Sequence, residues 1–308
     1  MPNSTSTQPE SSSPSQIETD ALLQRVNEAI SLGTFDPENQ AVLSQLVESL
    51  GDTRGLVRLR CAETLGDIGE PATPVLLEAL ANHQNVVVRR AAAKTLALIA
   101  DPVAVPNLLH AFLNDEDIVV QGSSVSAMAR IGEPAVDSLL GILFDTDLSQ
   151  ATKGHATWAL SFIGAEAITH LLGALESDSV DVRCGVIGAI AKVAREEPKA
   201  ELFEILIKAL TDNNEDVRCE AAAVLANLVY QPAIPALIDL LQLDNTKSRK
   251  SAALALMKIG VNRTSDDGIH SGLSGLKNAL ETETEPSVKS ILNLAINQIQ
   301  ESLRDSDG

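Results

Sequence analysis

The sequence contains few aromatic side chains and few cysteines. Aromatic residues are 2% of the 308 residues, and cysteine occurs only at Cys61, Cys184 and Cys219. Three thiols cannot all pair with one another, and their sparse placement is unlike the disulfide framework of a small secreted protein. We therefore expect reduced thiols in a cytoplasmic protein.

Positive charge is also scarce. The chain has 23 Lys and Arg against 42 Asp and Glu, a formal net charge of -19. Nucleic acids and anionic membranes both favour basic surfaces, so this balance argues against either as a partner. No apolar run approaches the roughly eighteen residues that span a bilayer, and the N-terminus lacks the pattern of a signal peptide. We expect a protein partner, no nucleic acid and no membrane insertion.

Motifs of common catalytic and metal sites are missing as well. The sequence has no Gly-rich phosphate loop, no HExxH element and no nucleophile elbow. His83, His110, His170 and His270 are isolated from other metal-ligating side chains at the spacings that metal sites use. No catalytic residue is assigned, and no metal site is predicted.

The two ends of the chain differ from its middle. The opening "MPNSTSTQPESSSPSQ" is rich in Ser and Pro and has too little apolar surface to offset the entropy of ordering it. Apolar residues at helical spacing begin near Thr19. We expect disordered tails at 1–18 and 302–308 and one solenoid at 19–301, with 261–301 as its divergent last unit.

A short segment recurs along the chain, as in "LVRLRCAETLGDIG", "VVRRAAAKTLALIA" and "DVRCEAAAVLANLV". Each copy is headed by a basic or polar residue, namely Arg58, Arg89, Gln121, Lys153, Arg183, Arg218, Arg249 and, more loosely, Lys289. A preceding helix opens with a proline near its N1 position (Pro71, Pro102, Pro134, Pro232). Strand-like alternation is absent, and the spacing is typical of helical repeats. The pattern predicts an all-α solenoid of roughly eight helix pairs.

Each repeat consists of a first helix, which the proline opens, and a second helix, which begins near the heading residue. Equivalent positions in the second helices can be compared by counting from the heading residue. Positions 7 and 10 are large and apolar, as at Leu65 and Ile68, and predict the core. Position 3 is small, as at Cys61, and predicts close helix packing. Positions 2, 5 and 9 are mostly polar or small, as at Arg60, and predict the solvent-facing side.

The fourth and fifth copies depart from this solvent-facing pattern. Three bulky rings in the fourth lie beside two glycines in the fifth, although glycine inside a helix costs about 1 kcal/mol relative to alanine. We predict an aromatic ridge beside a strip without side chains, forming a shallow pocket with basic residues at its edges. The predicted binding residues are His155, Trp158, Phe162, Gly185, Gly188, Arg130 and Lys192. An alignment slipped by one residue would instead turn Trp158 into the core.

Cys184 and Cys219 directly follow the heading arginine in successive copies. Stacked helices lie about 8–10 Å apart, which is too far for a disulfide. The first helical turn favours a thiolate, so the pair is a weak candidate for holding a metal or thiol-reactive ligand with further ligands from a partner. The other interpretation is two half-buried small residues.

The element "VRRAAAKTLALIADPVAVPNLL" and its copies, from about residue 39 to 260, resemble HEAT repeats. The similarity is greatest to the short HEAT-like repeat of the cyanobacterial phycobilin lyase E/F family, which includes phycobilisome degradation factors and non-catalytic adaptors. This resemblance implies a right-handed α-solenoid. It also implies proteins that attach, isomerise or remove a linear tetrapyrrole on a phycobiliprotein cysteine, often as a heterodimer of two solenoids.

For this chain, the resemblance implies binding of a phycobiliprotein subunit, a transient phycobilin or a second HEAT-repeat lyase subunit. His155, Trp158 and Phe162 would stack on the pigment, and Arg130 or Lys192 would meet its propionates. As an enzyme it would be a bilin lyase, and the attacked thiol would belong to the substrate protein. The alternative is a non-catalytic adaptor in phycobilisome turnover or in assembly of an iron–sulphur or photosynthetic complex, with an iron–sulphur group requiring a partner. The low Trp and Tyr content favours this alternative.

Overall fold

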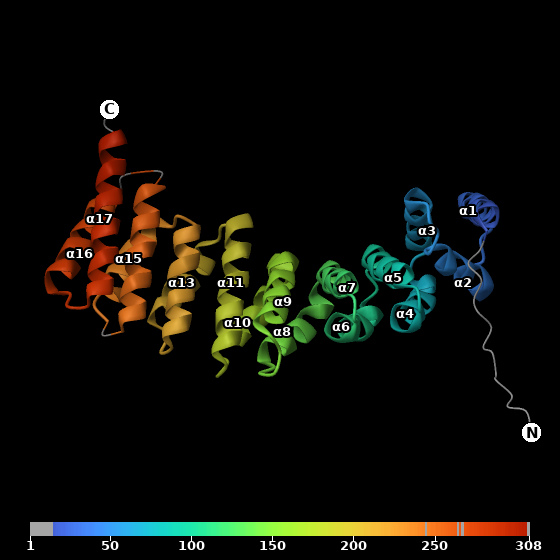
Figure 1. Ribbon diagram of the computed structural model, residues 1–308, viewed down its shortest axis with the longest axis horizontal. Helices are drawn as coiled ribbons and strands as arrows, with labels where there is room; N and C mark the ends of the chain where they lie inside the picture. Colours follow the sequence, from blue (N-terminus) through green and yellow to red (C-terminus); the bar gives the residue numbers. More distant parts are fainter. Residues whose placement is uncertain (1–14, 244, 264, 266–267, 307–308) are drawn as a thin grey trace, which may run out of the picture. The chain divides into compact units, whose positions relative to one another are not determined.

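The computed structural model describes residues 15–243, 245–263, 265 and 268–306, and every regular element within them is helical. The sequence predicts one solenoid, whereas the chain groups into two compact units, Met1–Ser138 and Leu139–Gly308. Both units are built from helix pairs (Figure 1). Within the described part of the chain, no helix combines the length and apolarity needed to cross a membrane.

The helices of the first unit begin with α1 (Gln16–Ser31). Three pairs follow: α2 (Gln40–Ser49) with α3 (Gly55–Ile68), α4 (Thr73–Asn82) with α5 (Val86–Ile99), and α6 (Val105–Asn114) with α7 (Ile118–Ile131). Helix α8 (Val136–Phe144) contains the boundary between the units.

Helix α8 pairs in sequence with α9 (Gln150–Ile163), the first long helix of the second unit. The remaining pairs are α10 (Ile168–Ala174) with α11 (Val180–Glu196), α12 (Ala200–Lys208) with α13 (Glu215–Asn227), α14 (Ile234–Leu240) with α15 (Thr246–Val261), and α16 (Ile269–Thr282) with α17 (Pro286–Ser306). The described residues therefore contain the eight pairs that the repeat predicts.

The N-terminal helix begins earlier than expected because a capping box precedes it. The Ser15 N–H donates to Glu18 Oε2 at 2.8 Å, and the Glu18 N–H donates to Ser15 Oγ at 3.4 Å. The tail predicted at 1–18 is therefore wrong for its last four residues. Its remainder, 1–14, lies outside the described residues.

The C-terminal helix also extends further than expected. Helix α17 continues to Ser306, and Arg263 Nη1 donates to Ser302 Oγ at 2.7 Å, which ties this end to the preceding pair. The tail predicted at 302–308 is therefore wrong for 302–306, and 307–308 lies outside the described residues.

The prolines predicted at the starts of first helices lie one turn earlier. Pro71, Pro102, Pro134 and Pro232 belong to short 3₁₀ segments that lead into α4, α6, α8 and α14. The missing proline N–H has no partner to lose in such a first turn. Proline therefore marks the entry to the helix pair, as predicted, but within a separate 3₁₀ turn.

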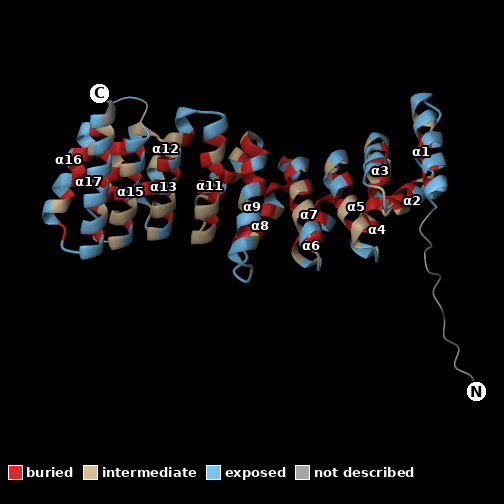
Figure 2. Ribbon diagram, turned by 45° about the horizontal axis from the view of Figure 1, so that its top comes forward, coloured by how far each residue is buried: buried red, intermediate tan, exposed pale blue. Residues whose placement is uncertain are grey.

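Buried residues lie between neighbouring helices (Figure 2). Position 7 is buried in all seven compared copies: Leu65, Leu96, Met128, Leu160, Ile190, Leu225 and Leu256. Position 10 is less regular, because Ile68, Ile99, Ile131 and Leu228 are only half-buried. Ile68, Ile99 and Ile131 are the last residues of α3, α5 and α7, and Leu228 directly follows α13. The prediction of a second full core column is wrong there.

Two heading arginines, Arg89 and Arg183, link their helices to the turn of the following pair. Arg89 Nε donates to Asp115 Oδ2 at 2.9 Å, and Arg183 Nε donates to Asp212 Oδ2 at the same distance. Arg183 Nη1 also donates to the Ser177 carbonyl at 2.7 Å. These side chains are largely buried, so each guanidinium aligns two turns through charge-assisted hydrogen bonds.

The same contact recurs in α15, where it predicts a pH-dependent stability. Arg249 Nε and Nη2 donate to Glu283 at 2.7 and 3.0 Å, and these bonds lower the pKa of that carboxyl. Because the pKa of Glu283 is lower in the folded protein, the contact contributes its full stabilisation at pH values above the ordinary carboxyl pKa of about 4. This stabilisation is lost as the pH falls through the pKa of Glu283 in the folded protein. We expect Arg249→Gln to lower the free energy of unfolding by about 1–2 kcal/mol at pH 7.

The measurement is urea unfolding of wild type and Arg249→Gln, followed by helical circular dichroism at pH 7, 5 and 3. We expect the difference between the two proteins to shrink toward pH 3. A difference that stays constant over this range would show that Glu283 does not titrate as the contact predicts.

One buried hydroxyl offers a stabilising substitution. Ser124, at position 3 of its repeat, is fully buried, and among the described atoms its Oγ has no hydrogen-bond partner. Ala92, Ala156 and Ala221 occupy this position in other copies. We expect Ser124→Ala to stabilise the protein by about 1–2 kcal/mol, since it removes an unsatisfied polar group and places a better helix former there. Thermal unfolding measures the change.

Ser126→Ala is the matched control in the same helix. Ser126 is half-buried, and its Oγ donates to the Gly122 carbonyl at 2.7 Å. We expect little or no stabilisation from this variant. Equal stabilisation by both variants would assign the gain to helix propensity alone.

Candidate functional site

Helix α9 presents its aromatic residues to solvent. Ser149 caps its start by accepting from the Thr152 N–H, and Ala156 and Leu160 are fully buried. This register leaves the Trp158 side of the helix uncovered. Trp158 is 42% exposed and Phe162 47% exposed, and His155 is also exposed. The alternative alignment, with Trp158 in the core, is wrong.

Trp158, Phe162 and Lys192 form an aromatic patch in the second unit. The centroids of the two rings lie 5.7 Å apart at an interplanar angle of 35°. Lys192 Nζ, from α11, lies 5.8 Å from the centroid of the Phe162 ring, within the range of a cation–π contact. The patch therefore offers two tilted aromatic faces with an ammonium group beside one of them.

The glycines of α11 have a packing role that the sequence comparison did not identify. A Cβ at Gly185 would lie 2.9 Å from Thr157 Oγ1 and 3.0 Å from Leu143 Cδ1. At Gly188 it would meet Thr157 Cγ2 at 3.6 Å and Glu220 Oε1 at 3.7 Å. Side chains of neighbouring helices thus already occupy the space beside Gly185, and the open pocket predicted there is wrong. The close approach that requires glycine is made by α9 and α8.

Arg130, the remaining predicted site residue, is exposed near the end of α7 in the first unit. His155, Trp158, Phe162, Gly185, Gly188 and Lys192 all lie in the second unit. Within the second unit, the structure brings Trp158, Phe162 and Lys192 together.

Cys184 and Cys61 do not provide a thiolate. All three are free, and burial together with the carboxylates of Glu220, Asp216 and Asp181 raises the pKa of Cys184 to about 12. The thiolate expected from the helix N-terminus is therefore wrong for Cys184, because burial and negative neighbours outweigh the helix dipole. Burial likewise raises the pKa of Cys61 to about 12. No cluster of three or more His, Cys, Asp and Glu suited to a metal occurs among the described residues.

The one tyrosine is engaged elsewhere. The Tyr230 ring stacks on Phe203 of α12, with centroids 4.0 Å apart and an interplanar angle of 12°. Both residues are half-buried. This stack holds the turn after α13 against α12. Tyr230 is therefore not part of the aromatic patch of α9.

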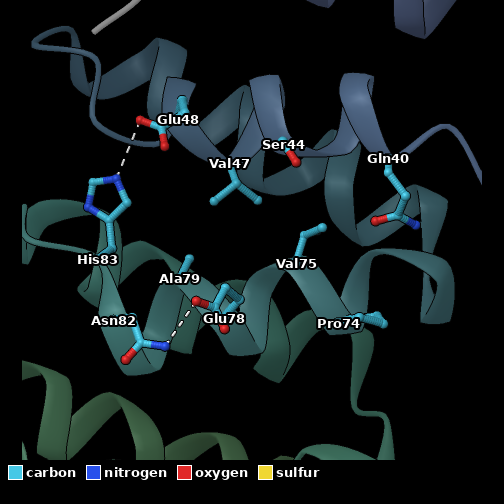
Figure 3. A pocket seen from close by; sticks show the side chains of 10 residues that line it. All are labelled: Gln40, Ser44, Val47, Glu48, Pro74, Val75, Glu78, Ala79, Asn82 and His83. Atoms are coloured by element: carbon cyan, nitrogen blue, oxygen red, sulfur yellow. Dashed lines mark hydrogen bonds and ion pairs between the residues drawn. The ribbon is translucent and has the colours of Figure 1, made fainter. Parts of the chain in front are cut away.

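A second candidate is a groove of about 470 Å³ between α2 and α4 in the first unit (Figure 3). Val47, Val75 and Ala79 line it, and His83 Nε2 lies 3.4 Å from Glu48 Oε2 at one end. The Asn85 N–H donates to His83 Nδ1 at 3.0 Å, which leaves Nε2 to donate to Glu48. This groove lies between first helices, whereas the residue pattern that predicts a binding site lies in second helices.

Sequence comparison finds two related repeat families. HEAT repeats match residues 73–161, 105–191 and 203–297, and the PBS lyase HEAT-like repeat matches residues 57–82. A bilin biosynthesis protein, MpeU of Synechococcus sp. (strain WH8020), is 36% identical over 279 residues, which cover 90% of this chain and 91% of that protein.

Solved structures show the same class of fold. Kap121p bound to Ste12p aligns with a TM-score of 0.60 and 15% identity, covering 94% of this chain and 38% of that chain. Kap121p bound to Pho4p gives a TM-score of 0.59, also at 15% identity, with the same coverage. At this identity the likeness concerns the all-α repeat fold alone.

Proposed function

The chain belongs to the phycobilin lyase-like family of HEAT-repeat proteins, and on that premise we propose that it binds a linear tetrapyrrole, or the phycobiliprotein subunit that carries one, and assists chromophore attachment. The name of the 36%-identical relative, a bilin biosynthesis protein, supports a role in bilin attachment. The bound molecule is a substrate that leaves with its own protein.

The aromatic patch is the observation that carries this proposal. A linear tetrapyrrole is a planar, conjugated molecule with propionate groups, and aromatic side chains stack on such surfaces. Trp158 and Phe162 supply two exposed faces, and the Lys192 ammonium lies beside Phe162. Lys192 would pair with a propionate while the rings hold the conjugated system.

The chemistry places few demands on this chain. In attachment to a phycobiliprotein, the nucleophilic thiol belongs to the substrate protein. Burial raises the pKa of Cys184 to about 12, which keeps this thiol protonated near neutral pH and unsuited to compete for the pigment. The proposed contribution is binding and orientation, which aligns the reacting groups without a catalytic side chain of its own.

Titration of the purified full chain with biliverdin, a linear tetrapyrrole with two propionates, tests the pigment half of the proposal. We expect a shifted visible absorption band with induced circular dichroism, because the bound pigment adopts one twisted conformation. A spectrum identical to that of free biliverdin, together with no retention of a phycobiliprotein apo-subunit on the immobilised chain, would refute the proposal.

The second candidate function is a non-catalytic adaptor in phycobilisome or photosynthetic complex assembly. It is favoured by the small number of rings that could stack on a pigment. Tyr230 is stacked on Phe203, which leaves Trp158 and Phe162 as the exposed rings of the second unit's long helices. Retention of the apo-subunit without any change in the biliverdin spectrum would support the adaptor over the pigment-binding function.

A further inference from the structure

Position 5 of the second helices differs in character between the two units. In the first unit this position is polar or charged, with Glu63, Lys94 and Ser126. In the second unit it carries no polar side chain except the indole N–H, and its residues are Trp158, Gly188, Ala223, Leu254 and, counted from Lys289, Leu294. We call these five residues the apolar row. Leu254 is 42% exposed and Leu294 48% exposed, so the row reaches solvent well beyond the aromatic patch.

The five helices that carry the apolar row pack in sequence. Helices α9, α11, α13, α15 and α17 each contact the next and lie side by side (Figure 1). Four steps of about 8–10 Å give a row about 32–40 Å long, which matches a helix of about 21–27 residues. In the middle of the row, Gly188 has no side chain and Ala223 has a small one. The larger side chains of Trp158 and Leu254 lie on either side of them. This profile suits a rod-like helix better than a single small molecule.

Basic side chains border one side of the apolar row. Lys192 and Lys258 occupy position 9 of α11 and α15, and neither forms an ion pair among the residues that the structure describes. Lys258 donates only to the neutral Asn227 Oδ1. The opposite side is mixed in charge, because Glu220 and Ser251 occupy position 2 and Lys250 occupies position 1 of α15. In a chain of net charge -19, two unpaired lysines beside exposed apolar residues indicate an acidic partner on that side.

We propose that the apolar row docks an amphipathic helix of a partner protein, with the apolar face of that helix on Trp158 and Leu254 and its acidic flank over Lys192 and Lys258. Such helix-in-groove recognition combines apolar anchors with flanking charge. The inference goes beyond the proposed function, because Leu254, Lys258 and Leu294 lie outside the aromatic patch. It assigns the second unit, and not the first, as the docking surface.

The probe is a designed 25-residue peptide with a leucine face, a glutamate flank and no tryptophan. Its partner peptide is identical except that lysine replaces every glutamate. Because Trp158 is the only tryptophan in the chain and lies in the row, its fluorescence reports binding at this place. We expect the acidic peptide to change Trp158 emission saturably and the basic peptide to bind at least tenfold more weakly. Equal binding of the two peptides would overturn the proposal.

Variants of the protein locate the contact. We expect Leu254→Asp and Lys258→Glu each to weaken the acidic peptide at least tenfold. Lys94→Glu, which reverses a charge at the exposed position 5 of the first unit, should change the affinity less than twofold. Unchanged helical circular dichroism confirms that the variants fold. Unaltered affinity in Leu254→Asp, or equal losses in Lys94→Glu and Lys258→Glu, would reject the row as the docking site.

The biliverdin titration separates this proposal from the proposed function. Leu254→Asp and Lys258→Glu should bind biliverdin as wild type does, because they leave the aromatic patch intact. If the acidic peptide fails to bind while biliverdin binds, the docking proposal falls and the pigment-binding function stands. If the peptide binds while biliverdin and the apo-subunit do not, the proposed function falls and the docking proposal stands.

Discussion

Trp158→Ala is expected to weaken binding of biliverdin by about 30-fold or more, which corresponds to the 2 kcal/mol or larger loss typical of a central aromatic contact. Trp158 contributes the larger of the two exposed rings, and its removal also leaves Phe162 without the ring 5.7 Å away. The variant should fold normally, because a side chain that is 42% exposed contributes little to the core. Visible absorption titration measures the affinity.

Two further variants test whether stacking is the cause. Trp158→Phe keeps an aromatic face and should recover most of the affinity. Phe144→Ala removes a ring that is 50% exposed at the end of α8, outside the aromatic patch, and should leave the affinity unchanged. Equal losses in Trp158→Ala and Phe144→Ala would show that biliverdin binds exposed apolar surface without a defined site.

Arg183→Ala is expected to have the largest effect on stability, about 2–4 kcal/mol, because it leaves a largely buried carboxylate without its cation. Arg183 Nε and Nη2 each donate to Asp212 at 2.9 Å, and Nη1 donates to the Ser177 carbonyl at 2.7 Å. These bonds join the α10–α11 turn to the turn before α13. Urea unfolding followed by Trp158 fluorescence reports on the adjacent helix α9.

Lys199→Ala is the matched control for Arg183→Ala. Lys199 forms an ion pair with Glu197 at 3.0 Å, but both side chains are exposed. Exposed pairs contribute about 0–1 kcal/mol, so the urea midpoint should barely move. A loss in Lys199→Ala as large as that in Arg183→Ala would mean that general charge balance, and not the buried contact between turns, determines stability here.

The amino-acid sequence by itself determined the class of fold and the register of the second helices. The burial of position 7 in all seven compared copies follows from the period of the repeat, as the full burial of Leu160 beside exposed Trp158 illustrates. Helical periodicity is a local property, and stacking neighbours preserve it from copy to copy. The exposed aromatic residues of α9 could therefore be located from the sequence.

Only the tertiary structure decided what lies beside those residues. The glycines of α11 predict open space from sequence, but Thr157 and Leu143 fill the position beside Gly185. The sequence position of Cys184 predicts a thiolate, but burial and carboxylates from α13 raise its pKa to about 12. Both outcomes depend on side chains from neighbouring helices, and spacing within one helix does not record how closely those helices approach. Periodicity thus fixes which side of a helix faces outward, whereas packing decides whether the space there is open.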